Sequence, residues 1–162
     1  MTDRSITTER SAQHASFTIE RMYDATPARV FAAFATSAAK MQWFGGPDDW
    51  PPGEHQLDFR EGGSERWSGG PPGGPAVTMH AVIWDVISNE RIVTTYEMHM
   101  NGARISVSLN TIELQAIEAR TRLRLTEHGV FLDGSDEPTD REHGTGKLLD
   151  SLAQYLESSA PR

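Results

Sequence analysis

The chain has no cysteine among its 162 residues. This absence excludes a disulfide framework, a thiolate zinc site and a cysteine nucleophile, and it fits a reducing compartment. The polar N-terminus lacks the apolar stretch of an export signal. No run approaches the ~20 apolar residues of a membrane-spanning helix. At this length we expect one domain, located in the cytoplasm, with no membrane partner.

Basic residues are in the minority, with 15 lysines and arginines against 23 acidic residues and a formal net charge of −8. The resulting negative field repels phosphate backbones, so nucleic-acid binding would need a local basic patch. Arg120, Arg122 and Arg124 are the best candidates, because a spacing of two puts them on one face of a strand. A solvated outer face is the simpler interpretation, and we expect no nucleic-acid partner.

The short motifs that mark common catalytic and metal sites are also missing. There is no HExxH zinc motif, no GxSxG nucleophile turn and no phosphate-binding loop. His80 and His99 fall on strands that are expected to pair, and neighbouring histidines can bind a metal or relay protons. An outward-facing pair is the simpler interpretation. We therefore predict no catalytic residue, no metal ligand and no cofactor.

Alternation of apolar and polar residues predicts seven strands. The clearest case is residues 85–98, where two alternating segments flank a short polar turn. Asn101 and Gly102 indicate a second hairpin, because both residues tolerate positive φ. The strands are expected at residues 17–23, 54–60, 64–68, 76–87, 91–100, 103–114 and 118–128. Strands that follow one another through hairpins form an antiparallel sheet.

Three helices are expected beside this sheet. Thr26 can cap the first, with Pro27 at its first position, and a second short helix is expected at residues 37–43, capped by Ser37. The last helix should run from a capping box of Thr139 and Glu142 to about residue 158. Its leucine stripe must pack on the sheet, which gives an α+β helix-grip fold.

In their order and spacing, these segments resemble the START-like, or SRPBCC, superfamily, and within it the activator of Hsp-90 ATPase homologue-like family. The likeness covers about residues 16–158, preceded by a flexible segment at residues 1–15. The matching segments are residues 19–25 with Val30 and Phe31, the pair Trp43 and Phe44, residues 90–93 with Thr95 and Tyr96, and residues 144–156. Where the family usually has Gly-Trp, this chain has Gly144 and Thr145. The missing indole leaves room near the last helix or is replaced by another side chain.

The resemblance implies a ligand site rather than a defined chemistry. Family members bind apolar ligands between helix and sheet, and a few relatives are cyclases or hydrolases. Eukaryotic relatives act on a chaperone with the help of a second, N-terminal domain, for which this chain is too short. We therefore expect a small apolar ligand as partner, with a homodimer and a chaperone interaction as open alternatives.

Inward positions of the expected strands and helices supply the candidate ligand-binding residues. A wall of aromatic side chains, adaptable methionines and a few polar groups is typical of small-molecule sites. The apolar candidates are Phe31, Phe34, Trp43, Phe44, Phe59, Trp67, Met79, Tyr96, Met98, Leu149, Leu152 and Leu156. The candidate polar members are Arg21, Asp58, Thr94 and Tyr96. Trp43, Phe44 and Trp67 are expected at the mouth, because they flank loops.

Two other functions compete with non-catalytic binding. A cyclase or hydrolase would need an acid–base pair in the cavity, for which Asp58, Tyr96, His80 and Arg21 are the candidates. A protein-interaction module would instead have a filled core and an exposed apolar patch on the sheet.

Overall fold

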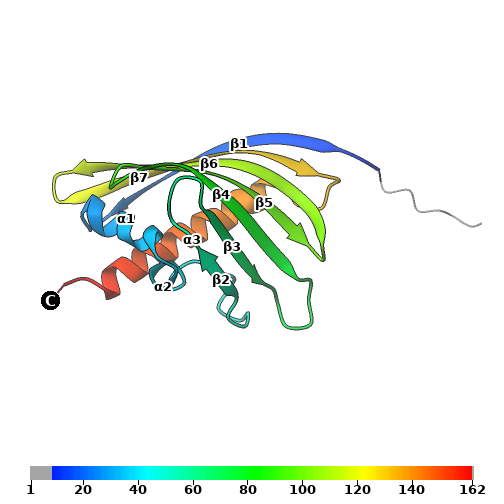
Figure 1. The fold of residues 1–162 in the computed structure, drawn as a ribbon, viewed down its shortest axis with the longest axis horizontal. Coiled ribbons are helices and arrows are strands. Elements are labelled where there is room, and N and C mark those ends of the chain that lie inside the picture. Colours follow the sequence, from blue (N-terminus) through cyan, green and yellow to red (C-terminus); the bar gives the residue numbers. More distant parts are fainter. Residues whose placement is uncertain (1–8, 162) are drawn as a thin grey trace, which may run out of the picture.

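The computed structural model describes residues 9–161. Its frame is one seven-stranded sheet in the order β1-β7-β6-β5-β4-β3-β2 (Figure 1). The strands are β1 (Ala12–Tyr23), β2 (Glu54–Leu57), β3 (Ser64–Gly69), β4 (Val77–Ile87), β5 (Arg91–Met100), β6 (Ala103–Ile117) and β7 (Arg120–Leu132). All neighbouring strands are antiparallel, as expected for segments that hairpins connect.

The helices are α1 (Pro27–Ala35), α2 (Ser37–Lys40) and α3 (Pro138–Ser158). Helix α3 runs along one face of the sheet, and α1 and α2 lie beside its C-terminal end (Figure 1). The predicted α+β helix-grip fold is confirmed, with two short helices after the first strand and one long helix at the end. No helix within residues 9–161 is long and apolar enough to cross a membrane.

Helix α3 packs mainly on β1 and α1. Its inward stripe is Leu149, Leu152 and Leu156, which are at most 5% exposed and belong to the largest apolar cluster. The Tyr23 hydroxyl donates to the Leu149 carbonyl over 2.8 Å. This contact ties α3 to the β1 edge of the sheet, so α3 leaves the central strands uncovered.

Several strand ends differ from the predictions. Strand β1 begins at Ala12, so part of the segment expected to be flexible is paired with β7, while residues 1–8 lie outside the described residues. Strands β6 and β7 continue past their expected ends to Ile117 and Leu132. Each extension is stabilised by ladder hydrogen bonds to a neighbour that alternation within one segment does not reveal.

Two of the three predicted helix caps are wrong. The Thr26 hydroxyl accepts from the Arg29 amide as predicted. Helix α2 is capped by Thr36 rather than Ser37, because the Thr36 hydroxyl accepts from the Ala39 amide at 3.1 Å. Helix α3 begins at Pro138 without a side-chain cap. Since proline favours the first helical position, the helix starts before the expected capping box.

Candidate functional site

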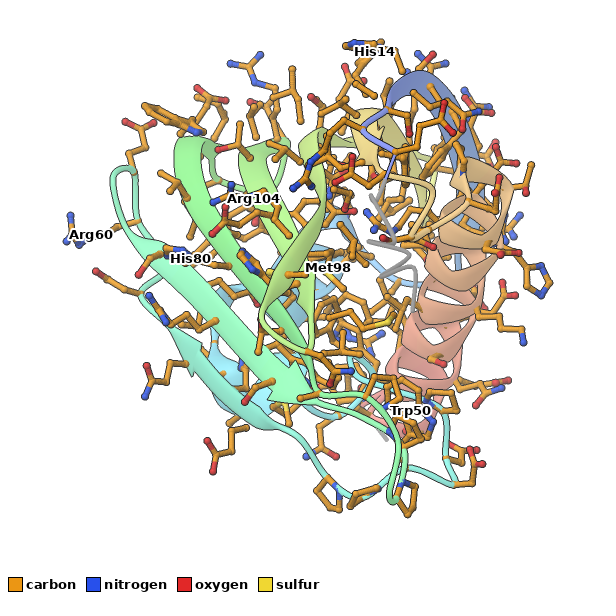
Figure 2. All side chains as sticks on the ribbon, turned by 90° about the vertical axis from the view of Figure 1, so that its right-hand side faces the viewer. His14, Trp50, Arg60, His80, Met98 and Arg104 are labelled. Carbon is orange, nitrogen blue, oxygen red and sulfur yellow. The ribbon has the colours of Figure 1, made fainter. Side chains whose placement is uncertain are left out.

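A cavity of about 1260 Å³ lies between the inner face of the sheet and α3. Its third wall is the segment between α2 and β2, here called the 41–53 loop. The volume exceeds the roughly 300–1,000 Å³ of a typical ligand pocket. Figure 2 shows Met98 between the sheet and α3, and Trp50 of the 41–53 loop beside the lower part of α3. The cavity is therefore large enough for a small molecule with a bulky apolar part.

Buried aromatic rings fix the inner end of the 41–53 loop. Trp43 is 7% exposed, and its indole N–H donates to the Ala33 carbonyl over 3.0 Å. Its ring also meets Phe34 edge-on, with the centroids 4.9 Å apart. The expectation that Trp43 lies at the mouth is wrong, because this hydrogen bond holds the ring against α1. The half-buried Trp50, further along the loop, also lines the cavity and is less buried than Trp43.

Trp67 of β3 lies in a slot between two glycines. A Cβ at Gly53 would stand 2.7 Å from the indole nitrogen, and a Cβ at Gly69 would stand 2.7 Å from the far end of the ring. Trp67 is 7% exposed, so it also lies in the wall rather than at the mouth. Its indole nitrogen has no hydrogen-bond partner among the described residues.

A first polar cluster joins α2 to β2 and β3. The Lys40 ammonium and the His55 ring contact opposite oxygens of the Glu65 carboxylate at 2.7 and 2.6 Å, and Ser37 Oγ is 2.8 Å from His55 Nδ1. Burial would raise the pKa of Glu65, but the Lys40 charge and both hydrogen bonds outweigh it and hold that pKa below its ordinary value. Lys40 and Glu65 line the cavity, whereas Ser37 and His55 do not, so the cluster chiefly anchors the start of the 41–53 loop.

A second polar cluster lies deeper and consists of Tyr96, Ser106, Glu127 and Arg141; it is called the Glu127 cluster below. The Tyr96 hydroxyl donates to Glu127 Oε1 over 2.7 Å and accepts from Arg141 Nη1 at 3.0 Å. Arg141 Nη2 donates to Ser106 Oγ and to Asp136 Oδ2, both at 2.8 Å. These bonds connect the start of α3 to the middle of the sheet.

Burial dominates the electrostatics of the Glu127 cluster. Glu127 is 2% exposed, and burial raises the pKa of its carboxyl above the ordinary value although Tyr96 and Arg141 act in the opposite direction. Burial, followed by the nearby Glu127 charge, also raises the pKa of Tyr96. A carboxyl and a phenol that hold their protons more strongly than usual can exchange hydrogen bonds with a bound molecule.

Nine of the predicted ligand-binding residues line the cavity. They are Phe34, Trp43, Phe44, Phe59, Trp67, Met79, Tyr96, Met98 and Leu149. Phe31, Leu152 and Leu156 differ from the prediction, because they lie outside the lining and pack with the core. The neighbours of Phe31 include Phe59, whose ring centroid is 5.6 Å away. These three side chains support the wall rather than form it.

The predicted polar members divide in the same way. Thr94 and Tyr96 line the cavity. Arg21 instead pairs with Asp150 at 2.9 Å, and Asp58 pairs with Arg60 on the exposed hairpin at 2.9 Å. Neither Arg21 nor Asp58 lines the cavity, so neither supplies the acid–base pair of an enzyme there.

The two histidines of β4 and β5 are not ladder partners, because His80 pairs with Glu97 and His99 pairs with Thr78. His80 and His99 approach the same Glu97 carboxylate oxygen at 3.9 and 3.2 Å. Neither of them lines the cavity. Within residues 9–161, no group of three or more histidine, aspartate or glutamate side chains is placed to hold a metal ion.

Sequence reasoning missed the charged residues of the cavity wall. Glu127 falls in phase with the buried Leu123 and Leu125 of β7, and Glu65 falls in phase with Trp67 of β3. A charged residue at an inward position of an alternating strand was therefore the available signal. Arg141 had no such signal, because the expected capping box placed it in the first turn of the helix, ahead of the leucine stripe.

The outer face of the sheet carries features of its own. Trp84 is 61% exposed, and Val107 and Leu109 of β6 are also exposed. Arg124 pairs with Glu20 at 2.8 Å, and with Arg122 it borders a smaller hollow of about 340 Å³ that is rich in both charge signs. The molecule thus combines an inner cavity with a few exposed apolar side chains on the outer face of the sheet, and the homodimer stays a prediction.

The comparisons with known proteins agree with this fold. The model of the family described as Activator of Hsp90 ATPase homolog 1-like protein matches residues 24–157. A solved structure of an uncharacterized protein from Rhizobium leguminosarum is 40% identical, with 94% of this chain and 100% of that chain covered and a TM-score of 0.89. No match is found among curated proteins.

Two further solved structures extend the likeness. A protein from Rhizobium loti is 42% identical, with 90% of this chain and 99% of that chain covered and a TM-score of 0.83. A protein from Chromobacterium violaceum is 21% identical, with 88% and 96% covered and a TM-score of 0.74. The last of these shows the shared fold alone.

Proposed function

The chain belongs to the Activator of Hsp90 ATPase homolog 1-like family, and from this premise we propose that it binds a small amphipathic molecule between the sheet and α3. The proposal is supported mainly by the combination of apolar walls and a buried polar cluster in one cavity. Aromatic, methionine and leucine side chains form its walls, and a connected polar cluster lies at its inner end. Apolar walls with a few convergent polar groups are the usual form of a small-molecule site.

The departure from the family pattern at Gly144 and Thr145 supports the same proposal. Both residues line the cavity, so the position where the family usually has an indole is the position that borders empty space. The Thr145 hydroxyl is turned back to the Arg141 carbonyl at 2.8 Å. A tryptophan here would take up volume that is open in this chain.

Uptake of N-phenyl-1-naphthylamine, an uncharged dye that fluoresces in apolar surroundings, tests the proposal. Ala81 lines the cavity, and it faces Tyr96 across the β4–β5 ladder. Ala81→Phe therefore adds a ring that projects into the cavity beside Tyr96, while Val82→Phe adds the same ring on the opposite face of the same strand. We expect dye uptake by the wild type and by Val82→Phe, and its loss in Ala81→Phe. Equal uptake by all three folded proteins would reject cavity binding.

A second candidate function is an enzyme that uses acid–base chemistry. The observation in its favour is Glu127, a buried carboxyl with a raised pKa, which contacts both a phenol and a guanidinium. Such a group is suited to hold or transfer a proton inside a cavity. Any turnover found for a bound molecule should disappear in Glu127→Gln while that molecule still binds.

A further inference from the structure

The inner end of the cavity contains acceptor groups that have no donors. Glu127 of β7 pairs with Asn110 of β6 in the ladder, and both residues line the cavity. Glu127 Oε2 and Asn110 Oδ1 are buried and have no hydrogen-bond partner among residues 9–161. The Ser108 hydroxyl, at the next inward position of β6, also has no partner among these residues, and since it has a single O–H it can serve at most one of these oxygens. Buried polar groups are normally hydrogen-bonded, so these acceptors call for a donor from outside the chain.

The one cation near Glu127 is already engaged within the described residues. Arg141 donates to Tyr96, Ser106 and Asp136, and its Nη1 is 3.6 Å from Glu127 Oε2. That distance is an ion pair without a hydrogen bond. Arg141 therefore leaves the second oxygen of Glu127 open to another donor.

The charges around the cavity favour a positive ligand. The lining holds three basic side chains, Lys40, Arg141 and Lys147, against six acidic ones, Asp48, Glu65, Glu127, Asp136, Asp140 and Asp150. Lys40 pairs with Glu65 and Arg141 pairs with Asp136, both at 2.7–2.8 Å. An anionic head group would meet an excess of carboxylates, whereas a cationic group would meet complementary charge.

We propose that the ligand carries a positively charged hydrogen-bond donor, of the primary amine type, which binds at Glu127 Oε2 and Asn110 Oδ1 with its apolar part against Met79 and Met98. This inference rests on the proposed function and specifies the ligand of the same cavity. It separates amphipathic amines from the carboxylates and phosphates of common lipids, because only the amine supplies both the charge and the N–H groups that the site lacks.

A series of compounds with one tail and different head groups tests the inference. Dodecylamine, dodecyltrimethylammonium, dodecan-1-ol and dodecanoic acid are each titrated below their micellar concentrations against the dye-loaded protein. We expect dodecylamine to bind at least tenfold more tightly than dodecanoic acid. The trimethylammonium compound, which has the charge but no N–H donor, should bind more weakly than the primary amine.

Two variants assign the preference to the inner end of the cavity. Glu127→Gln should bring the affinities for amine and acid to within about twofold of each other while dodecan-1-ol binds as before. Glu113→Gln removes an exposed glutamate from the neighbouring strand and should leave the tenfold preference intact. Retention of the preference in Glu127→Gln would overturn the inference, because general attraction to an acidic protein would then explain it.

The remaining outcomes separate this inference from the proposed function. Equal binding of all four compounds by the wild type, or tighter binding of dodecanoic acid, would overturn the head-group inference and leave cavity binding in place. A trimethylammonium compound that binds as tightly as the primary amine would overturn the hydrogen-bonding role of Glu127 and Asn110. Failure of all four to displace the dye, together with failure of the dye to bind, would overturn both.

Discussion

The Tyr96 hydroxyl donates a 2.7 Å hydrogen bond to Glu127 Oε1 and thereby joins β5 to β7 across the intervening strand β6. The backbone ladder links only adjacent strands, so this bond is a second, side-chain connection through the inner face of the sheet. It also holds the Glu127 carboxyl at the inner end of the cavity. The stability of the domain and the form of its candidate site are therefore linked at this pair.

Tyr96→Phe removes the donor and leaves Glu127 Oε1 without it. We expect a loss of about 1–3 kcal/mol in the free energy of unfolding, since a hydrogen bond to a buried carboxyl is lost. Urea denaturation measures the change. Tyr155→Phe is the matched control, because Tyr155 also lines the cavity and, within the described residues, only its backbone carbonyl takes part in side-chain hydrogen bonds. Equal losses in the two variants would contradict this role of Tyr96.

Glu127→Gln should change the pH dependence of stability. Burial raises the pKa of Glu127 in the folded protein, so the folded state holds this proton to a higher pH than the unfolded chain. Stability is therefore lost as the pH rises from the ordinary value of about 4.3 through the folded pKa. The variant has no such loss, so its melting temperature relative to wild type should rise with pH over this range. A difference that stays constant with pH would contradict the assignment.

Lys40→Met breaks the buried pair with Glu65, whose side chain is 6% exposed. Loss of one partner of a buried pair costs about 3–5 kcal/mol, and chemical denaturation at neutral pH should show it. The control is Arg60→Met, which breaks the exposed pair with Asp58 and should cost less than about 1 kcal/mol. Similar losses in both variants would show that the Lys40–Glu65 pair does not anchor the 41–53 loop.

The stability contributed by the Lys40–Glu65 pair should depend on pH in the opposite direction to that contributed by Glu127. The pKa of Glu65 is lowered in the folded protein, since Lys40 and His55 outweigh the effect of burial. Stabilisation by its charge is therefore complete above the ordinary value of about 4.3 and is lost as the pH falls through the folded pKa. The difference in stability between wild type and Lys40→Met should shrink over that fall, as thermal melts at several pH values would reveal.

Leu152→Ala and Met98→Ala separate the core from the cavity wall. Leu152 is 0% exposed and packs in the core, so its truncation should cost about 2–5 kcal/mol and change dye affinity little. Met98 borders space that is already open, so Met98→Ala should weaken dye binding at a smaller cost in stability. If Leu152→Ala weakened dye binding and Met98→Ala did not, the dye would bind outside this cavity.

Much of the fold could be predicted because the alternation of apolar and polar residues in strands and the leucine spacing of the last helix can both be read within a short segment. Strand β5 has the predicted bounds, Arg91–Met100, and Asn101 and Gly102 take the positive φ values that the hairpin needs. The start of β1 was not predictable in this way, because the exposed residues from Ala12 are strand only through their pairing with β7.

The candidate site was only partly predictable for a different reason. Apolar inward residues were found from alternation, but Leu152 and Leu156 pack within the core, while Leu149 borders the cavity. Which leucine meets empty space depends on where α3 crosses the sheet. Glu127 was overlooked because a charged residue on a strand is usually solvent-facing, and only its phase with Leu125 marks it as inward.

Native mass spectrometry of the gently purified protein tests binding in the cavity most directly. We expect a folded species with added mass that disappears on denaturation, and the same species in Val82→Phe but not in Ala81→Phe. Added mass that persists in folded Ala81→Phe, or a bare mass for the wild type both alone and after incubation with dodecylamine, would contradict this expectation.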